Sequence, residues 1–143
     1  MKVNEVMTRH VCTCSPDQPI RDVARLMADI DAGFIPVAEN DRLVGTITDR
    51  DIALRAVGRG MGPDTAASEV MSAEIKYCFD DEATEHVAKN MAAARVRRLP
   101  VVNRDKRLVG VVPLGDLATG GTSPARTGKA LEGISQRGNG GGA

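Results

Sequence analysis

The fold of this chain is decided by residues 42–52, which read RLVGTITDRDI, and by residues 107–117, which read RLVGVVPLGDL. Each stretch holds an apolar run rich in β-branched residues, and such runs favour strands. An aspartate follows each run, at Asp51 and at Asp116, and an aspartate at this place is typical of the first turn of a helix. Both stretches therefore predict a strand that leads directly into a short helix.

The same spacing extends along most of the chain. Three further pairs of matches keep their order at an offset of about 64 residues, which lengthens by one at the inserted Lys106: EVMT at 5–8 with EVMS at 69–72, VARLMA at 23–28 with VAKNMA at 87–92, and IPV at 35–37 with LPV at 99–101. A constant offset over several ordered matches indicates one structural unit present twice.

Each copy predicts the order strand, helix, strand, strand, helix. In the first copy we expect a strand at Val11–Cys14, a helix whose apolar face runs from Ile20 to Ile30, a hairpin formed by 34–38 and 43–48, and a helix from Asp49. The second copy repeats this from a strand at Ile75–Phe79. Each copy has only about 50 residues, which is too few to bury an apolar core that would keep one copy stably folded by itself. We therefore expect an α+β fold whose two repeats pack sheet to sheet with pseudo-twofold symmetry.

The expected domains are a first repeat at 1–57, a linker at 58–66, a second repeat at 67–118 and a flexible glycine-rich tail at 119–143. Asp17 and Asp81 stand just before the two long helices, where an acidic side chain favours the helix start. We expect both to act there as a cap or as a first-turn charge.

Composition excludes several classes of protein. The 19 basic side chains balance 19 acidic ones, and aromatic residues make up only 2%, so nucleic acid is not expected as the main partner. No apolar run approaches the length of a membrane helix, and the first residues do not resemble a signal peptide. The three cysteines are an odd number, which favours a reducing compartment, and we expect a cytoplasmic protein.

The three cysteines, together with His10 and His86, could be interpreted as ligands of a metal site. Their spacing matches no zinc pattern, so we expect no metal and interpret Cys12, Cys14 and Cys78 as small buried apolar residues.

The duplicated pattern resembles the CBS domain, which usually occurs as a tandem pair called a Bateman module. The resemblance rests on VMT at 6–8, IPV at 35–37 and LVGTITDRDI at 43–52, each with its counterpart in the second copy, and it covers about residues 3–118. It implies a stand-alone regulatory module, not an enzyme, that binds AMP, ADP, ATP, NAD or S-adenosylmethionine. The family motif is a glycine, then a threonine or serine, then an aspartate that accepts hydrogen bonds from both ribose hydroxyls.

The first copy keeps this motif in Gly45, Thr48 and Asp51. A carboxylate suits a vicinal diol because it offers two acceptor oxygens. The resemblance implies composite clefts, in which Asp51 is faced by residues of the second copy that bind adenine through their backbone and phosphate through their guanidinium groups. These residues are Lys76, Tyr77, Arg97, Arg98, Leu99 and Pro100.

The second copy departs from the motif, because Pro113 stands where a threonine or serine is usual. Asp116 remains, and the resemblance places it opposite Cys12, Thr13, Gly33, Phe34 and Pro36. We therefore expect the cleft of Thr48 and Asp51 to bind phosphate better than the cleft of Asp116. Spacing alone leaves other roles open: the two aspartates as helix caps, and the arginines at 95–98 as part of a solvated face.

Three functions follow from this sequence. The leading one is a sensor of an adenine nucleotide that responds by a change of conformation or association. The alternatives are a structural adaptor with vacant sites, suggested by Pro113, and a nucleotide-processing enzyme, for which no catalytic motif is present. We also expect a homodimer and an unidentified protein effector.

Overall fold

The computed structural model of the protein describes residues 1–121, and the burial of side chains as far as Leu117. These residues divide into two compact units. Among the described residues, the unit Cys12–Ile75 is continuous in sequence, whereas the other unit combines Met1–Val11 with residues 76–121. Each unit therefore holds the hairpin and helices of one copy and the first residues of the other copy.

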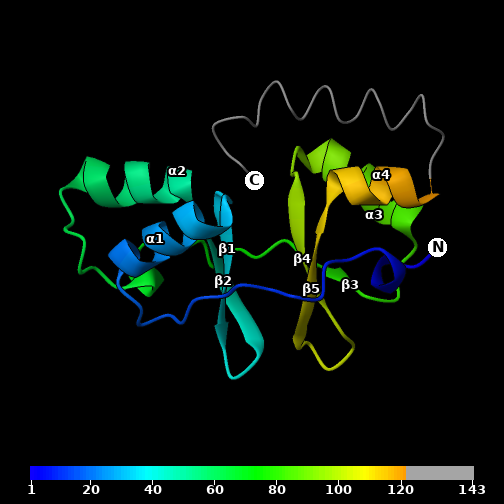
Figure 1. Ribbon diagram of the computed structural model, residues 1–143, viewed down its shortest axis with the longest axis horizontal. Helices are drawn as coiled ribbons and strands as arrows, with labels where there is room; N and C mark the ends of the chain where they lie inside the picture. Colours follow the sequence, from blue (N-terminus) through cyan, green and yellow to red (C-terminus); the bar gives the residue numbers. More distant parts are fainter. Residues whose placement is uncertain (122–143) are drawn as a thin grey trace. The chain divides into compact units, whose positions relative to one another are not determined.

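The unit Cys12–Ile75 is built from a helix, a β-hairpin and a second helical stretch. Figure 1 shows both helical stretches on one face of the hairpin. The elements are α1 (Ile20–Ile30), β1 (Phe34–Glu39), β2 (Arg42–Thr48), α2 (Asp49–Asp51), the π-helical turn η2 (Ile52–Ala56), and the short 3-10 turns η3 (Val57–Arg59) and η4 (Ala67–Glu69).

The other unit repeats this plan with a third, short strand. Its strand β3 lies parallel to β4, and β4 is antiparallel to β5. The elements are η1 (Val3–Glu5), β3 (Cys78–Phe79), α3 (Thr84–Ala94), β4 (Arg98–Val102), β5 (Leu108–Pro113) and α4 (Leu114–Gly121). The predicted α+β class and the hairpin with its flanking helices are thus confirmed in both copies. Helix α4 includes the first residues of the expected tail, and 122–143 lie outside the described residues.

The hairpin of the first copy closes through a tight turn. Asn40 and Asp41 both have positive φ, at 53° and 64°, a conformation that asparagine and aspartate tolerate better than most residues. The resulting register pairs Glu39 with Arg42 and, at the open end, Phe34 with Thr48. The end of β1 that follows α1 is therefore fixed beside the end of β2 that starts α2.

The first strand of each copy is much shorter than predicted. The Val11–Cys14 prediction is wrong in its length, because only Cys14 forms a bridge, to Val37. Ile75–Phe79 reduces to Cys78–Phe79. The prolines of the adjacent strands, Pro36 and Pro100, explain both differences. To extend further toward the start of the segment, the parallel ladder would need the N–H of the residue directly before Val37 or Val101, and proline has none.

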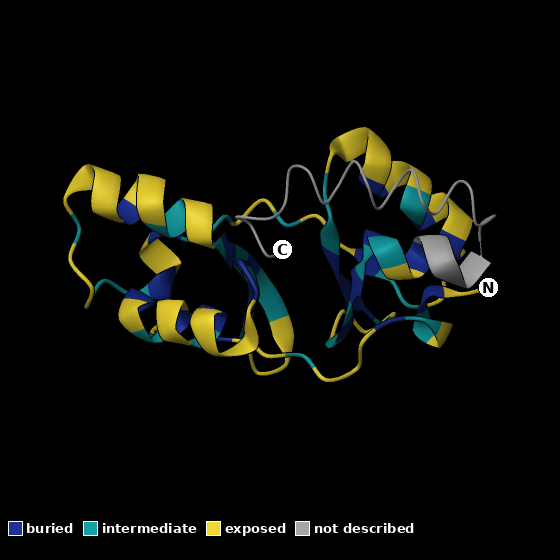
Figure 2. Cartoon of the chain, turned by 45° about the horizontal axis from the view of Figure 1, so that its top comes forward, coloured by how far each residue is buried: buried dark blue, intermediate teal, exposed yellow. Residues whose placement is uncertain are grey.

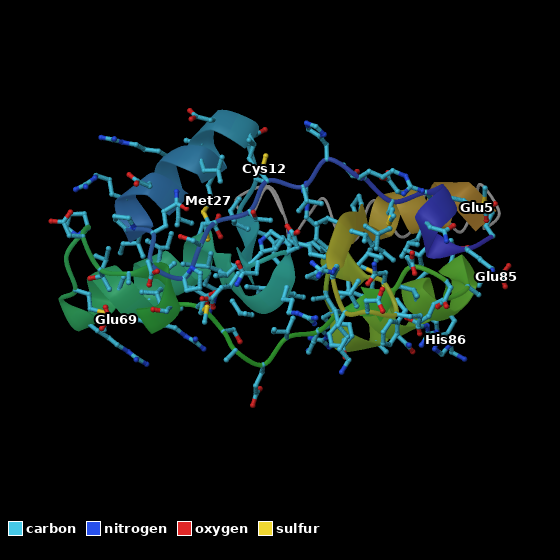
Figure 3. All side chains as sticks on the ribbon, turned by 90° about the horizontal axis from the view of Figure 1, so that it is seen from below. Glu5, Cys12, Met27, Glu69, Glu85 and His86 are labelled. Atoms are coloured by element: carbon cyan, nitrogen blue, oxygen red, sulfur yellow. The ribbon has the colours of Figure 1, made fainter. Side chains whose placement is uncertain are left out.

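The two units exchange the first residues of the copies, which we call the lead segments, residues 1–8 and 65–72. Val3 donates to the Glu82 carbonyl at 2.9 Å, and at the matching position Ala67 donates to the Gln18 carbonyl at 2.8 Å. Figure 3 labels Glu5 and Glu69, the acidic residues of these segments, each on the unit of the other copy's helices. The motif EVMT or EVMS is therefore a docking segment for the opposite copy.

Each lead segment packs its methionine over a glycine of a hairpin strand. A Cβ atom at Gly45 would lie 2.5 Å from the Met71 sulfur, and one at Gly110 would lie 2.7 Å from the Met7 sulfur. Such distances are far below van der Waals contact, so only glycine fits there while the methionine keeps its place. The glycine of each LVG motif is explained by this close approach.

The expectation that Asp17 and Asp81 cap the long helices is wrong for α1 and α3. Their N-caps are Pro19 and Ala83, and neither helix has a side-chain cap. Backbone carbonyls take that role: Ile20 donates to Thr65 at 2.8 Å, and Thr84 donates to Met1 at 2.9 Å. A lead segment thus satisfies the first free amide of each helix, and no acidic side chain is needed.

Each unit has its own apolar core, to which the exchanged lead segment contributes. In the unit Cys12–Ile75, Ala67 and Val70 are fully buried with Val23, Ile35 and Ile47. In the other unit, Val3 is fully buried in the corresponding core. Figure 2 shows the buried residues along the strands and on the helix faces turned toward them. No helix within residues 1–121 is long and apolar enough to span a membrane.

Candidate functional site

The predicted motif residues Thr48 and Asp51 form a capping box at the start of α2. The Thr48 hydroxyl accepts from the Asp51 amide at 3.0 Å, and the Asp51 Oδ2 atom accepts from the Thr48 amide at 3.0 Å. The i, i+3 spacing of the motif is what this reciprocal pairing requires. The capping role that spacing alone left open for Asp51 is therefore present in the structure.

The capping box leaves most of the acceptor capacity of Asp51 unused. Its side chain is 19% exposed, so one edge reaches solvent, and Oδ1 lies 3.9 Å from the Nε atom of Arg55. An ionised carboxylate offers about four lone-pair positions, of which the Thr48 amide uses one. Held in this way, the carboxylate can still accept hydrogen bonds from two adjacent hydroxyl groups of a sugar.

The hairpin brings further predicted site residues next to this carboxylate. Phe34 pairs directly with Thr48, and Pro36 pairs with Thr46. The Gly33 carbonyl accepts from the Asp49 amide at 3.0 Å. Cys12 and Thr13 are exposed and lie just before the Cys14 bridge in the same unit. The hairpin register and this hydrogen bond thus place Gly33 and Phe34 at the open end of the hairpin, where the helix of Asp51 begins.

The second copy has the same geometry without the capping box. Pro113 ends β5, and it has neither a hydroxyl nor an amide proton, so it can form neither half of the reciprocal pair. Leu114 donates to the Arg97 carbonyl at 2.8 Å, as Asp49 does to Gly33. Asp116 is exposed, in contrast to Asp51. The motif aspartate of the second copy is therefore held by a different set of contacts.

Basic residues line the second copy at the positions where the first copy has glycine and phenylalanine. Arg97 matches Gly33, and Arg98 matches Phe34 and pairs with Pro113. The Arg97 Nη1 atom is buried and has no hydrogen-bond partner among the described residues. Leu99 and Pro100 are buried in β4, whereas Lys76 and Tyr77 are exposed before β3. The structure groups these residues with Asp116 in one unit.

Two groupings of the site residues are therefore distinct. Within its own unit, Asp51 lies with Gly33, Phe34 and Pro36, a set that the resemblance had assigned to Asp116. The hairpin register explains this grouping. A turn that pairs Glu39 with Arg42 also pairs Phe34 with Thr48 at the open end. That each aspartate also meets residues of the other copy stays a prediction.

One residue next to the candidate site, Arg55, lies outside the family motif. Its Nε atom lies 3.9 Å from Asp51, and its Nη1 atom donates to the Met71 carbonyl at 3.4 Å. The spacing of four residues from Asp51 in a helix was the available signal, because side chains at i and i+4 lie on one face.

The two buried cysteines are unreactive apolar residues in this fold. Burial raises the pKa of Cys14 to about 11. Burial raises the pKa of Cys78 to about 12, with a further contribution from the nearby Glu82 and Asp80 carboxylates. Both therefore stay protonated at neutral pH, and a thiol is a poor nucleophile and metal ligand. Cys12 is exposed, which differs from the predicted burial. No group of three His, Cys, Asp or Glu residues that could hold a metal is present in residues 1–121.

A family model of the CBS domain matches this chain twice, at residues 3–58 and 67–120. CBS domain-containing protein YhcV of Bacillus subtilis is 43% identical over 135 residues, which cover 94% of this chain and 96% of that protein. The crystal structure of Hypoxic Response Protein I with two coordinated zinc ions is similar with a TM-score of 0.76 at 30% identity, over 84% of this chain and 98% of that chain. The CBS domain pair of protein MJ0100, in complex with 5′-methylthioadenosine and S-adenosyl-L-methionine, is similar with a TM-score of 0.72 at 25% identity, over 83% of this chain and 94% of that chain.

Proposed function

This chain belongs to the CBS domain family, and from that premise we propose that it is a regulatory module that binds an adenosyl-containing small molecule. The observation that carries the proposal is the Thr48–Asp51 capping box, which holds a partly exposed carboxylate at the open end of a hairpin. The MJ0100 pair in complex with two adenosyl ligands supports the ligand class. AMP, ADP, ATP and NAD are the candidates alongside S-adenosylmethionine.

In this proposal Asp51 accepts both ribose hydroxyls, and Thr48 supports the ribose or the phosphate. Backbone groups and apolar side chains near Phe34 and Pro36 surround the adenine. A second site is centred on Asp116, in the unit that also holds Arg97 and Arg98, whose guanidinium groups suit a phosphate. The expectation that the Asp51 cleft binds phosphate better, which relied on these arginines, stays a prediction. The remaining ligand contacts that we propose are Cys12, Thr13, Gly33, Lys76, Tyr77, Arg97, Arg98, Leu99 and Pro100.

The test begins with thermal unfolding of the full chain in the presence of adenosine, AMP, ATP, NAD and S-adenosylmethionine. Binding to the folded state raises Tm, and calorimetry then gives Kd for the ligand with the largest shift. Charge-assisted hydrogen bonds contribute ~1.5–3 kcal/mol, so Asp51→Ala should weaken binding by about tenfold to a hundredfold. Asp51→Asn retains an acceptor for the Thr48 amide and separates ligand contact from capping.

Asp49→Asn is the matched control. Asp49 is two residues away and exposed, and its side chain accepts only from the Arg50 amide among the described residues. The Asp49→Asn substitution should therefore leave the Kd of the ligand unchanged. Equal losses in Asp51→Asn and Asp49→Asn would contradict the proposed role of Asp51, and no thermal shift with any of the ligands would contradict the ligand class.

A structural adaptor is the second candidate, and Pro113 favours it for the second copy, since one polar group of the motif is lost there. Calorimetry on Asp116→Ala distinguishes the two candidates. A second binding event that is present in the unsubstituted chain and absent in this variant supports a ligand site in the second copy. We propose that the module is not an enzyme, works in the cytoplasm as a homodimer, and signals to a protein effector. Recovery of the bound ligand chemically unchanged tests the absence of catalysis, and light scattering tests the homodimer.

A further inference from the structure

Arg55 is held in place at two points beside the candidate ligand carboxylate. It lies one helical turn after Asp51, with Nε 3.9 Å from Oδ1. Its Nη1 atom donates to the Met71 carbonyl at 3.4 Å. Met71 is itself packed over Gly45, and its neighbour Ser72 bridges to Thr46 on β2. The guanidinium is therefore anchored through the lead segment of the second copy.

This anchoring leaves the guanidinium with donors for a ligand. An arginine has five N–H donors, and among the described residues Arg55 makes only the one hydrogen bond to Met71. Its side chain is 44% exposed, so the group is accessible from solvent. Because these two contacts restrict the guanidinium, a phosphate group would bind it with less loss of side-chain freedom than it would bind an unrestrained arginine.

A cation at this position changes the electrostatics of the site. A ribose bound by Asp51 alone would bring its phosphate close to a negative carboxylate, and like charges repel. A guanidinium next to the same carboxylate offsets that charge. Four helical residues correspond to a rise of about 6 Å, so Arg55 lies a short distance beyond the atoms that would hold the sugar.

The second copy has no counterpart of this arginine. The offset of 65 residues that aligns Asp51 with Asp116 aligns Arg55 with Gly120. The feature therefore belongs to the first copy only, and the fold does not require it.

We propose that Arg55 selects an anionic group on the ligand held by Asp51, so that the unit Cys12–Ile75 binds phosphorylated adenosyl ligands in preference to uncharged ones. This inference rests on the proposed function and adds the ligand charge to it. Arg55 is a specificity-determining residue for the phosphate, and Asp51 is the ligand residue for the sugar.

The experiment measures Kd for adenosine and for AMP by calorimetry, on the full chain carrying Asp116→Ala so that the first copy is observed alone. AMP should bind about tenfold more tightly than adenosine, as expected for a partly exposed charge-assisted contact. Arg55→Gln should remove this difference and leave the Kd of adenosine within about twofold. Arg50→Gln is the matched control, because its guanidinium makes no contact among the described residues, and it should retain the difference.

Two further measurements separate this role from a structural one. Arg55→Lys retains the charge without the fork and should show an intermediate preference even if Arg55→Gln fails to fold. Raising the salt concentration should weaken the binding of AMP and leave the binding of adenosine unchanged. Equal binding of AMP and adenosine, or a preference that survives Arg55→Gln, overturns the inference while the proposed function stands. Binding of neither ligand overturns this role of Arg55, and the thermal shifts with ATP, NAD and S-adenosylmethionine then decide the proposed function separately.

Discussion

The ends of the two hairpins differ in chemistry while they agree in geometry. In both copies the residue after the second hairpin strand donates to a carbonyl at the start of the first strand, Asp49 to Gly33 and Leu114 to Arg97. In the second copy α4 begins after Pro113, which can form no capping box. The Thr48–Asp51 box is therefore a feature of the first copy, and we propose that its carboxylate also binds the ligand.

The two hairpin ends also differ in the charge of the residues around them. The first copy places Gly33 and Phe34 beside its aspartate, and the second copy places Arg97 and Arg98 at the same positions. A duplicated fold thus keeps the contacts of its backbone and lets the side chains at the hairpin ends diverge. We expect two sites of unequal character for this reason.

The largest expected effect concerns where a folding unit begins and ends. Residues 1–57 contain a complete sequence repeat, but they lack Ala67 and Val70 of their own core. We expect that fragment to show no cooperative thermal transition, whereas a fragment of residues 12–75 melts cooperatively. Circular dichroism during heating distinguishes the two. A cooperative melt of residues 1–57 would show that the exchanged lead segment is dispensable.

Alanine at the hairpin glycines should be the next largest effect. At Gly45 a Cβ atom would meet the Met71 sulfur at 2.5 Å and the Ser72 carbonyl at 3.0 Å, and Gly110 is similarly confined. Overpacking of this kind costs ~1–3 kcal/mol, so Gly45→Ala and Gly110→Ala should both lower the free energy of unfolding in urea by that amount. Gly62→Ala is the control, because its Cβ would meet nothing within 4 Å. A similar loss in all three variants would contradict the explanation.

Removal of the capping box should affect one copy only. Thr48→Ala removes the hydroxyl that accepts from Asp51 and should reduce stability by ~1 kcal/mol. Thr48→Ser keeps the hydroxyl and should retain most of that stability. Pro113→Ala has no cap to remove, and urea unfolding should show a smaller change. Equal losses in Thr48→Ala and Pro113→Ala would mean that the box contributes nothing specific.

The smallest effect is a pH dependence in the unit of α3. Arg104 donates to both carboxylate oxygens of Asp81, at 2.8 and 2.6 Å, and this hydrogen bonding lowers the pKa of Asp81. A lowered pKa means that the pair stabilises the fold at neutral pH and that this stability is lost as the pH falls below about 4. Asp81→Asn should therefore lower Tm slightly at pH 7 and not at pH 2.

The corresponding residue of the other unit is the control for this pair. Asp17 is exposed and makes no side-chain contact among the described residues. Asp17→Asn should leave Tm unchanged at both pH values. A loss of Tm in Asp81→Asn that is the same at pH 2 as at pH 7 would contradict an electrostatic origin.

Periodicity and repetition were sufficient to predict the elements that interact locally. The apolar spacing from Ile20 gives the observed bounds of α1, Ile20–Ile30, and the β-rich runs around a polar turn give the hairpin. The first strands were predicted too long because the residues that shorten them, Pro36 and Pro100, lie in the neighbouring strand. Neither proline has an N–H to donate to the first strand. A pattern read along one segment does not show which donors its neighbour lacks.

The candidate site was predictable in part for a similar reason. The resemblance singled out Thr48 and Asp51, but their reciprocal hydrogen bonds follow from the helix start. The grouping of Asp51 with Phe34 depends on hairpin register, and the contact of Arg55 with Met71 depends on the exchange of the lead segments. Contacts between segments 16 or more residues apart leave no mark in local spacing.

The exchange of the lead segments also bears on how the chain is made. Residues 1–8 are translated before their partner strand β5, which is synthesised about 100 residues later, an interval of about 5–20 s at ordinary rates of translation. The unit Cys12–Ile75 can be completed during this interval from residues already emerged. Residues 1–8 are therefore translated early and dock late, and until then Val3 and Met7 are exposed to chaperones and to other nascent chains.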